Sequence, residues 1–146
     1  MTAFQFRLEK VLAWRRTQLE VEDAKLRRQI AALAELDRAR AELEATAIRS
    51  EVQVRDWNPL AGQDLAALSN FHLHIRNREK DLAERRRDAV QQLDAQQQAL
   101  LVARRRCRLL ERLEQRRLTE WQACADREVE QLAAESYLSG LSRRRT

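Results

Sequence analysis

The stretch that decides the fold of this chain is DWNPLAGQD, which spans residues 56–64. It contains the only proline of the 146-residue sequence, Pro59, and Gly62, one of its two glycines. An asparagine before proline disfavours a continuing helix, and Asp64 has the side chain of a helix N-cap. We therefore predict a turn over residues 56–64 with a helix on each side of it.

The composition supports long helices around this turn. Two glycines and one proline are too few for the many tight turns of a β-sandwich, a barrel or a doubly wound sheet. Alanine, leucine, glutamate, glutamine and arginine are abundant, and they favour helices because they lose little rotamer freedom there. The 28 basic residues nearly balance the 23 acidic ones and leucines recur regularly, which is not the composition of a disordered chain.

Before the turn, apolar residues recur every seven positions, which is the repeat of a coiled coil. One row of this repeat consists of Leu12, Leu19, Leu26 and Leu33. The second row is less regular and consists of Leu8, Arg15, Glu22, Gln29, Leu36 and Leu43. Polar seam residues lower stability but specify register and partner, so we expect pairing with one designated partner rather than with copies of the same helix.

After the turn the repeat resumes at Leu65 and keeps its phase for about ten heptads. The sequence thus predicts an all-α fold, a single long antiparallel two-helix coiled-coil hairpin. Its first helix covers residues 4–54 and its longer second helix residues 64–138. Gly140 is predicted to stop the second helix and to leave a basic tail over residues 139–146.

The unequal lengths predict an overhang. At 1.5 Å per residue the second helix extends past the first by roughly 35 Å, over about residues 114–138. A two-helix fold has no partner for this stretch, and an exposed apolar strip usually marks an interaction site. The alternatives are that the overhang frays or that it pairs with a second copy of the chain.

Signatures of catalysis and of metal binding are absent from the sequence. There is no glycine-rich phosphate loop, no G-x-S-x-G and no Cys-x-x-Cys. His72 and His74 lie about 200° apart around a helix, which disfavours joint metal ligation. We therefore expect a protein that is not an enzyme and that uses no cofactor and no metal.

The cysteines and the hydropathy pattern predict a location. Cys107 and Cys124 would lie about 25 Å apart on one helix, too far for a disulfide, so we expect both to be small packing residues in a reducing compartment. No run of about 18 apolar residues exists, and the first residues lack the apolar block of a signal peptide. We therefore expect a cytoplasmic protein.

Three arginine triplets, at residues 85–87, 104–106 and 143–145, raise the possibility of nucleic-acid binding. Consecutive residues on a helix point about 100° apart, so each helical triplet is spread around the axis. Acidic Glu84 and Asp88 also flank the first triplet. We therefore interpret the triplets as solvated flanks of a coiled coil. Contact with phosphate remains an alternative for the last triplet, residues 143–145.

Motifs at both ends of the chain resemble one known family. Residues 4–16, FQFRLEKVLAWRR, have the pattern F-x-F-x-L-E-x-V-L-x-x-R, and residues 109–121, LLERLEQRRLTEW, are similar to an L-x-E-x-L-x-E-x-R run. Residues 127–135 occupy the place of a terminal R-x-E…L-D-E segment, with Ala134 where an aspartate is usual, and residues 68–75 resemble an aromatic-aliphatic run after the turn. Together with the length, these features resemble FliJ, the small coiled-coil protein of the bacterial flagellar export apparatus.

The resemblance implies an antiparallel hairpin similar to the coiled coil of the rotary ATPase γ subunit. Such a protein acts as the central stalk of the hexameric export ATPase, promotes its assembly and activity, links it to the membrane export gate and hands on substrate chaperones. It would be peripheral to the inner membrane through these partners. Injectisome type III secretion systems use a related stalk protein. A structural homodimeric coiled coil and a nucleic-acid-binding hairpin are the alternative classes of function.

The resemblance and the overhang together suggest two contact regions. The expected contacts with the ATPase hexamer are Phe6, Trp14, Leu110, Leu113, Arg116, Arg117, Trp121, Glu128, Glu135 and Tyr137. The expected contacts with the export gate are Phe71, Ile75, Arg78 and Leu82. Ile75 and Leu82 also occupy seam positions and are expected in the core, whereas Phe71 lies off the predicted seam and is the better candidate for a partner contact.

Overall fold

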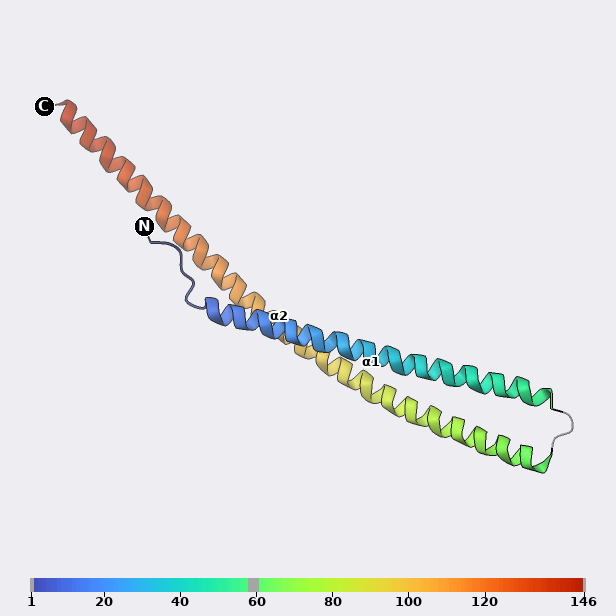
Figure 1. Cartoon of the computed structure of the whole chain (residues 1–146). Coiled ribbons are helices and arrows are strands. Elements are labelled where there is room, and N and C mark those ends of the chain that lie inside the picture. The colour runs from blue at the N-terminus through green and yellow to red at the C-terminus, as the bar shows by residue number, and fades with distance from the viewer. Residues whose placement is uncertain (1, 58–60, 146) are drawn as a thin grey trace. The chain divides into compact units, whose positions relative to one another are not determined.

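The computed structural model of this chain describes residues 2–57 and 61–145, which form two long α-helices packed against each other (Figure 1). Helix α1 spans Glu9–Arg55, 47 residues, and helix α2 spans Gly62–Arg144, 83 residues. Over the described ranges there is no strand. The predictions of an all-helical chain and of a longer second helix are therefore confirmed, whereas Pro59 of the predicted turn lies outside the described residues.

Helix α2 begins two residues earlier than predicted, and Asp64 caps it from a different position. Ala61 is the residue at the cap, because its carbonyl accepts from the amides of Asp64 and Leu65 at 3.1 and 3.2 Å. The Asp64 carboxylate reaches back and accepts from the Ala61 amide at 3.1 Å. Asp64 therefore acts from the third helical position, as the acidic member of a capping box does, and its charge also suits the helix N-terminus.

Helix α1 begins at Glu9, so the predicted start at residue 4 is wrong. The Glu9 amide donates to the Phe6 carbonyl at 3.1 Å, and the residues before this turn are not helical. Phe4 and Phe6 are both half-buried, while Gln5 between them is exposed. A helix would point the two phenylalanines about 200° apart, whereas a non-helical segment lets both contact the same neighbour.

Helix α2 continues through Gly140 to Arg144, so the predicted stop at Gly140 and the predicted tail over residues 139–146 are wrong. Glycine tolerates a left-handed helix end but does not impose one. The hydroxyls of Ser139 and Ser142 each donate to the carbonyl three residues earlier at 2.9 Å. Basic Arg143 and Arg144 occupy the last turn, where positive charge stabilises a helix end.

Internal packing divides the chain into two units. The terminal unit consists of residues 2–20 and 102–145, and the central unit consists of residues 21–57 and 61–101. Each unit contains part of α1 and part of α2.

In the central unit the apolar core lies on α2 at Ile75, Leu82 and Leu100, which are 7%, 4% and 5% exposed. The facing side chains of α1 are half-buried and follow the predicted repeat. They are Glu22, Leu26, Gln29, Leu33, Leu36 and Leu43. The predicted placement of Glu22 and Gln29 in the seam is therefore confirmed.

Gln96 of α2 forms hydrogen bonds with one of these polar seam residues, Glu22. Its Nε2 donates to the Glu22 carboxylate and also to the Glu22 backbone carbonyl, the latter at 3.1 Å. The bond from Gln96, with help from Lys25 and against some desolvation, holds the pKa of Glu22 below its ordinary value. Two turns later on α1, the buried Oε1 of Gln29 has no hydrogen-bond partner among the described residues.

In the terminal unit the core consists of Leu12 on α1 with Cys107 and Ala125 on α2, which are 1%, 4% and 8% exposed. The repeat of α2 shifts by one residue here. Leu118 and Ala125 turn inward, whereas a seven-residue repeat continued from Ile75 and Leu82 would place Arg117 and Cys124 there. The shift has a simple geometric cause: a helix of 3.6 residues per turn drifts against a strict seven-residue repeat.

Gly140→Ala tests the helical state of this position. Nothing lies within 4 Å of a Cβ added at Gly140. Because alanine is the better helix former, we expect the variant to stabilise the last turns of α2 by up to about 1 kcal/mol. Slower hydrogen exchange at the amides of residues 141–144 measures this effect. Faster exchange would instead show that Gly140 adopts a left-handed conformation.

Candidate protein-binding surfaces

A cleft in the terminal unit lies between the segment before α1 and the side of α2. Its volume is about 1150 Å³, and residues 2–8 line one side of it. Leu113, Arg117, Glu120 and Trp121 of α2 line the other side. The Phe4 and Trp121 rings contact each other with centroids 6.0 Å apart and planes inclined by 54°. We call this site the aromatic cleft.

Charged groups lie at the edge of the aromatic cleft. Arg117 Nη1 lies 3.0 Å from Glu120 Oε2 on α2, so this arginine is positioned by its neighbour one turn away. Arg7 adds a second guanidinium from the opposite side. Aromatic faces beside guanidinium groups suit a protein partner with apolar and acidic side chains.

Four of the residues expected to contact the ATPase gather at this cleft: Phe6, Leu113, Arg117 and Trp121. Phe4, Arg7 and Glu120 also line it and were not among the expected contact residues. The sequence contains an indication that Phe4 lies beside Phe6 in the cleft. Phe4 and Phe6 alternate with polar residues, as the side chains of an extended segment do. The signal for Glu120 was its spacing of three residues from Arg117.

The other expected ATPase contacts lie outside the cleft. Trp14 is 53% exposed and carries the Arg15 guanidinium 4.7 Å from its ring centroid. Leu110 is half-buried and Arg116 is exposed on α2. Glu128, Glu135 and Tyr137 are exposed on the part of α2 that follows Ala125.

Residues 126–145, the last part of α2 with the residue that follows it, form a segment in which every described side chain is exposed. We call it the bare segment. Val129 and Leu132 are 54% and 65% exposed, and Tyr137 and Leu138 are 70% and 63% exposed. The predicted unpartnered stretch is therefore present, but it begins at residue 126 instead of about residue 114.

The residues expected to contact the export gate lie in the central unit and divide into two groups. Ile75 and Leu82 are buried, which confirms their expected core position. Phe71 is half-buried with its ring centroid 6.3 Å from that of His72, so it is partly in the seam rather than off it. Arg78 is held by Asp81 at 2.9 Å, and its side chain is 44% exposed.

The first arginine triplet is largely paired with carboxylates. Arg85 Nε lies 3.3 Å from Asp81 Oδ2, and Arg86 Nε lies 2.8 Å from Asp37 Oδ1 of α1. Positive charge that is already neutralised by fixed carboxylates attracts phosphate weakly. Arg86 of this triplet therefore contributes to the contact between the helices of the central unit.

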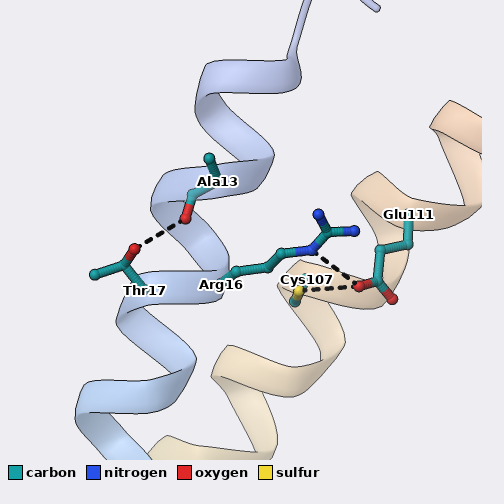
Figure 2. Close-up of polar contacts among 5 residues, drawn as sticks. All are labelled: Ala13, Arg16, Thr17, Cys107 and Glu111. Atoms are coloured by element: carbon teal, nitrogen blue, oxygen red, sulfur yellow. Dashed lines mark hydrogen bonds and ion pairs between the residues drawn. The ribbon is translucent and has the colours of Figure 1, made fainter.

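Figure 2 shows the polar contacts around Cys107 in the terminal unit. Its thiol donates to Glu111 Oε1 at 3.6 Å, and Arg16 Nε of α1 lies 3.5 Å from the same oxygen. Burial, followed by the nearby Glu111 carboxylate, raises the pKa of the Cys107 thiol, and Arg16 opposes the rise. Cys107 is thus the packing residue that was predicted, whereas Cys124 is exposed and that part of the prediction is wrong.

Over residues 2–57 and 61–145, no group of three His, Cys, Asp or Glu side chains is arranged to hold a metal ion. In the same ranges neither helix contains a stretch both long and apolar enough to cross a membrane.

Comparisons with protein-family models, with curated proteins and with solved structures give no match to this chain.

The two cysteines should differ in reactivity. The thiolate is the nucleophile, so a raised pKa lowers the fraction of Cys107 that is present as thiolate at any given pH. Burial also restricts access of a reagent to the Cys107 sulfur. We expect a thiol reagent at pH 8 to label Cys124 first and Cys107 more than about tenfold more slowly. Mass spectrometry of the labelled peptides measures both rates.

Glu111→Gln refines this test, since it removes the negative charge beside Cys107 and keeps the size of the side chain. The pKa of Cys107 should fall in this variant. The pH at which labelling of Cys107 accelerates should therefore be lower than in the wild type. Labelling of Cys124 provides the internal control. Equal rates for both thiols in the wild type would contradict the buried position of Cys107.

Proposed function

We propose that this protein is a non-enzymatic component of the bacterial flagellar export apparatus, the coiled-coil central stalk of its hexameric ATPase. One observation carries the proposal. The resemblance to the FliJ family depends on motifs at opposite ends of the sequence, and residues of both motifs line the aromatic cleft. Phe4 and Phe6 come from the first motif, and Leu113, Arg117 and Trp121 come from the second.

The pairing of the helices supports an antiparallel coiled coil, which is the architecture that such a stalk requires. In the central unit Glu22 contacts Gln96 while Asp37 contacts Arg86. In the terminal unit Phe4 contacts Trp121 while Arg16 contacts Glu111. In each unit the residue number rises on the N-terminal side as it falls on α2, as it does between antiparallel partners.

The surface chemistry is consistent with a stalk that contacts several subunits in turn. Exposed ion pairs such as Arg117–Glu120 are weak and screened by salt, so they favour reversible contacts. The aromatic cleft supplies the apolar anchors that concentrate binding energy in a few side chains. We place the ATPase contact at this cleft and along the bare segment.

The remaining roles follow from the same proposal. Phe71 and Arg78 of the central unit offer the accessible part of the expected gate contact, and Ile75 and Leu82 support them from the core. Export chaperones are the third class of partner. The protein would reside in the cytoplasm, peripheral to the inner membrane through these partners, and gene adjacency to a flagellar or an injectisome ATPase would distinguish the two export systems.

The proposal is tested by adding the protein to the purified export ATPase of the same organism. We expect the wild type to promote hexamer formation and ATP hydrolysis. Phe6→Ala combined with Trp121→Ala should weaken the interaction by about 2 kcal/mol or more, roughly thirtyfold in affinity, because it removes two apolar anchors. Analytical ultracentrifugation and a hydrolysis assay measure the two effects.

Two variants control this experiment. Trp57→Ala removes a 48% exposed tryptophan from the central unit and should leave stimulation unchanged. Arg117→Glu alters only a mostly exposed charge, so it tests the cleft with little risk to folding. If the wild type stimulated neither assembly nor hydrolysis, the stalk assignment would be wrong. If both cleft variants stimulated like the wild type, the contact would lie elsewhere.

A further inference from the structure

Positive charge is concentrated on one side of α2 in the terminal unit. Residues 102–119 contain seven arginines and two glutamates. Both glutamates lie on the seam side of the helix, because Glu111 accepts from the thiol of buried Cys107 and Glu114 is half-buried. The arginines on the opposite side of α2 therefore have no acidic residue beside them on that face.

The outward side of this part of α2 has the residue spacing of a second seam. Steps of three and four residues alternate along it, which is the spacing of side chains that pack against another helix. Each position lies between about 140° and 220° around the axis from buried Cys107, and each is exposed. The residues of this face, which we call the arginine stripe, are Val102, Arg105, Leu109, Arg112 and Arg116.

The charges of the arginine stripe are not neutralised within the chain. Arg105, Arg112 and Arg116 form no ion pair with the described residues, whereas Arg86 of the central unit is paired with Asp37. Arg112 and Arg116 also lie four residues apart, where like charges repel each other and destabilise a helix. Binding of negative charge to the stripe would relieve this repulsion.

Two aliphatic side chains alternate with these arginines. Val102 and Leu109 are 43% and 64% exposed and lie seven residues apart on the stripe. Apolar side chains at this spacing pack against a second helix, whereas a phosphate backbone offers no apolar group that would cover them. Two aliphatic side chains are also too few to hold a helix in the surface of a lipid bilayer. The stripe therefore fits a helix that is both acidic and apolar better than it fits nucleic acid or a membrane.

We propose that the arginine stripe binds an acidic amphipathic helix of a partner protein, which packs along residues 102–119 of α2. Carboxylates of the partner face Arg105, Arg112 and Arg116, and its apolar side chains cover Val102 and Leu109. The contact is about 26 Å long at 1.5 Å per residue. A second copy of this chain bound through the same stripe is disfavoured, because arginine would face arginine in a two-fold interface.

This inference goes beyond the proposed function. The arginine stripe contains none of the residues that line the aromatic cleft, and of the residues expected to contact the ATPase only Arg116 belongs to it. The experiments below contain no ATPase, and their outcome is therefore separate from the test of the stalk assignment.

A synthetic peptide tests the chemistry of the partner. The probe is a helical peptide about three heptads long, with leucine at the first position of each heptad and glutamate at the fourth, fifth and seventh. We expect the full-length wild-type protein to bind this peptide with a Kd below about 100 μM at low salt, measured by fluorescence anisotropy. Binding should weaken at about 200 mM salt, because the arginines are exposed. A control peptide with lysine in place of each glutamate should not bind.

Two matched charge reversals locate the contact. Arg112→Glu should weaken binding of the acidic peptide by roughly tenfold, because it replaces attraction with repulsion. Lys10→Glu makes the same change in net charge on the outward side of α1, about 200° from buried Leu12, and should weaken binding by less than about twofold. Arg112→Glu also places opposite charges four residues from Arg108 and Arg116, so its thermal unfolding midpoint should not fall.

Leu109→Ser separates a protein partner from nucleic acid. It removes an exposed apolar side chain without a change in charge, so the acidic peptide should bind roughly fivefold more weakly, whereas weak binding of a duplex DNA probe should not change. A wild-type protein that bound duplex DNA more tightly than the peptide at about 200 mM salt would overturn the proposal in favour of nucleic acid. No binding of the peptide to the wild type, or equal binding to Arg112→Glu and Lys10→Glu, would overturn it outright.

Discussion

In each unit a seam between its part of α1 and its part of α2 supports the structure. The buried side chains of the described residues, among them Leu12, Ile75, Leu82, Leu100, Cys107 and Ala125, lie at these seams. An isolated helix gains little stability from propensity alone, so most of it must come from packing at these seams. The ion pairs Arg16–Glu111 and Asp37–Arg86 flank the seam and are partly exposed, which makes them guides of register more than sources of stability.

The seam of the central unit contains two polar residues of α1, Glu22 and Gln29, and they differ in their hydrogen bonding. Glu22 receives two hydrogen bonds from Gln96, and the one to its carboxylate favours the charged form by lowering its pKa. Gln29 has a buried oxygen that receives none from the described residues. Such positions lower the stability of the pair, but they also penalise any alternative register that would leave more polar atoms unpaired. A helix pair of this kind selects one partner.

Sequence periodicity predicted much of this arrangement because each helix has a single face to bury. The spacing of Leu12, Leu19, Leu26 and Leu33 identified the stripe of α1, and the interruptions at Glu22 and Gln29 were placed correctly in it. On α2 the same reasoning failed in two places. Leu65, where the repeat was expected to resume, is 53% exposed, whereas Phe71, expected off the seam, is half-buried. After Glu114, small differences decide which residue turns inward. Arg117 and Leu118 are adjacent, and the drift of a real helix against a seven-residue repeat moves the seam from one to the other. The aromatic cleft was only partly predictable, since its formation depends on a segment that is not helical.

By itself the sequence determined that this chain forms two long helices whose break lies within residues 56–64, and which stripe of α1 avoids water. Glycine and proline are rare, and leucine spacing is a local property that any helix expresses. Only the tertiary structure decided that Phe4 leaves the helix to contact Trp121, that Ala125 replaces Cys124 in the core, and that α2 continues bare beyond it. These outcomes depend on which surface another part of the chain can cover. Local propensity carries no information about that.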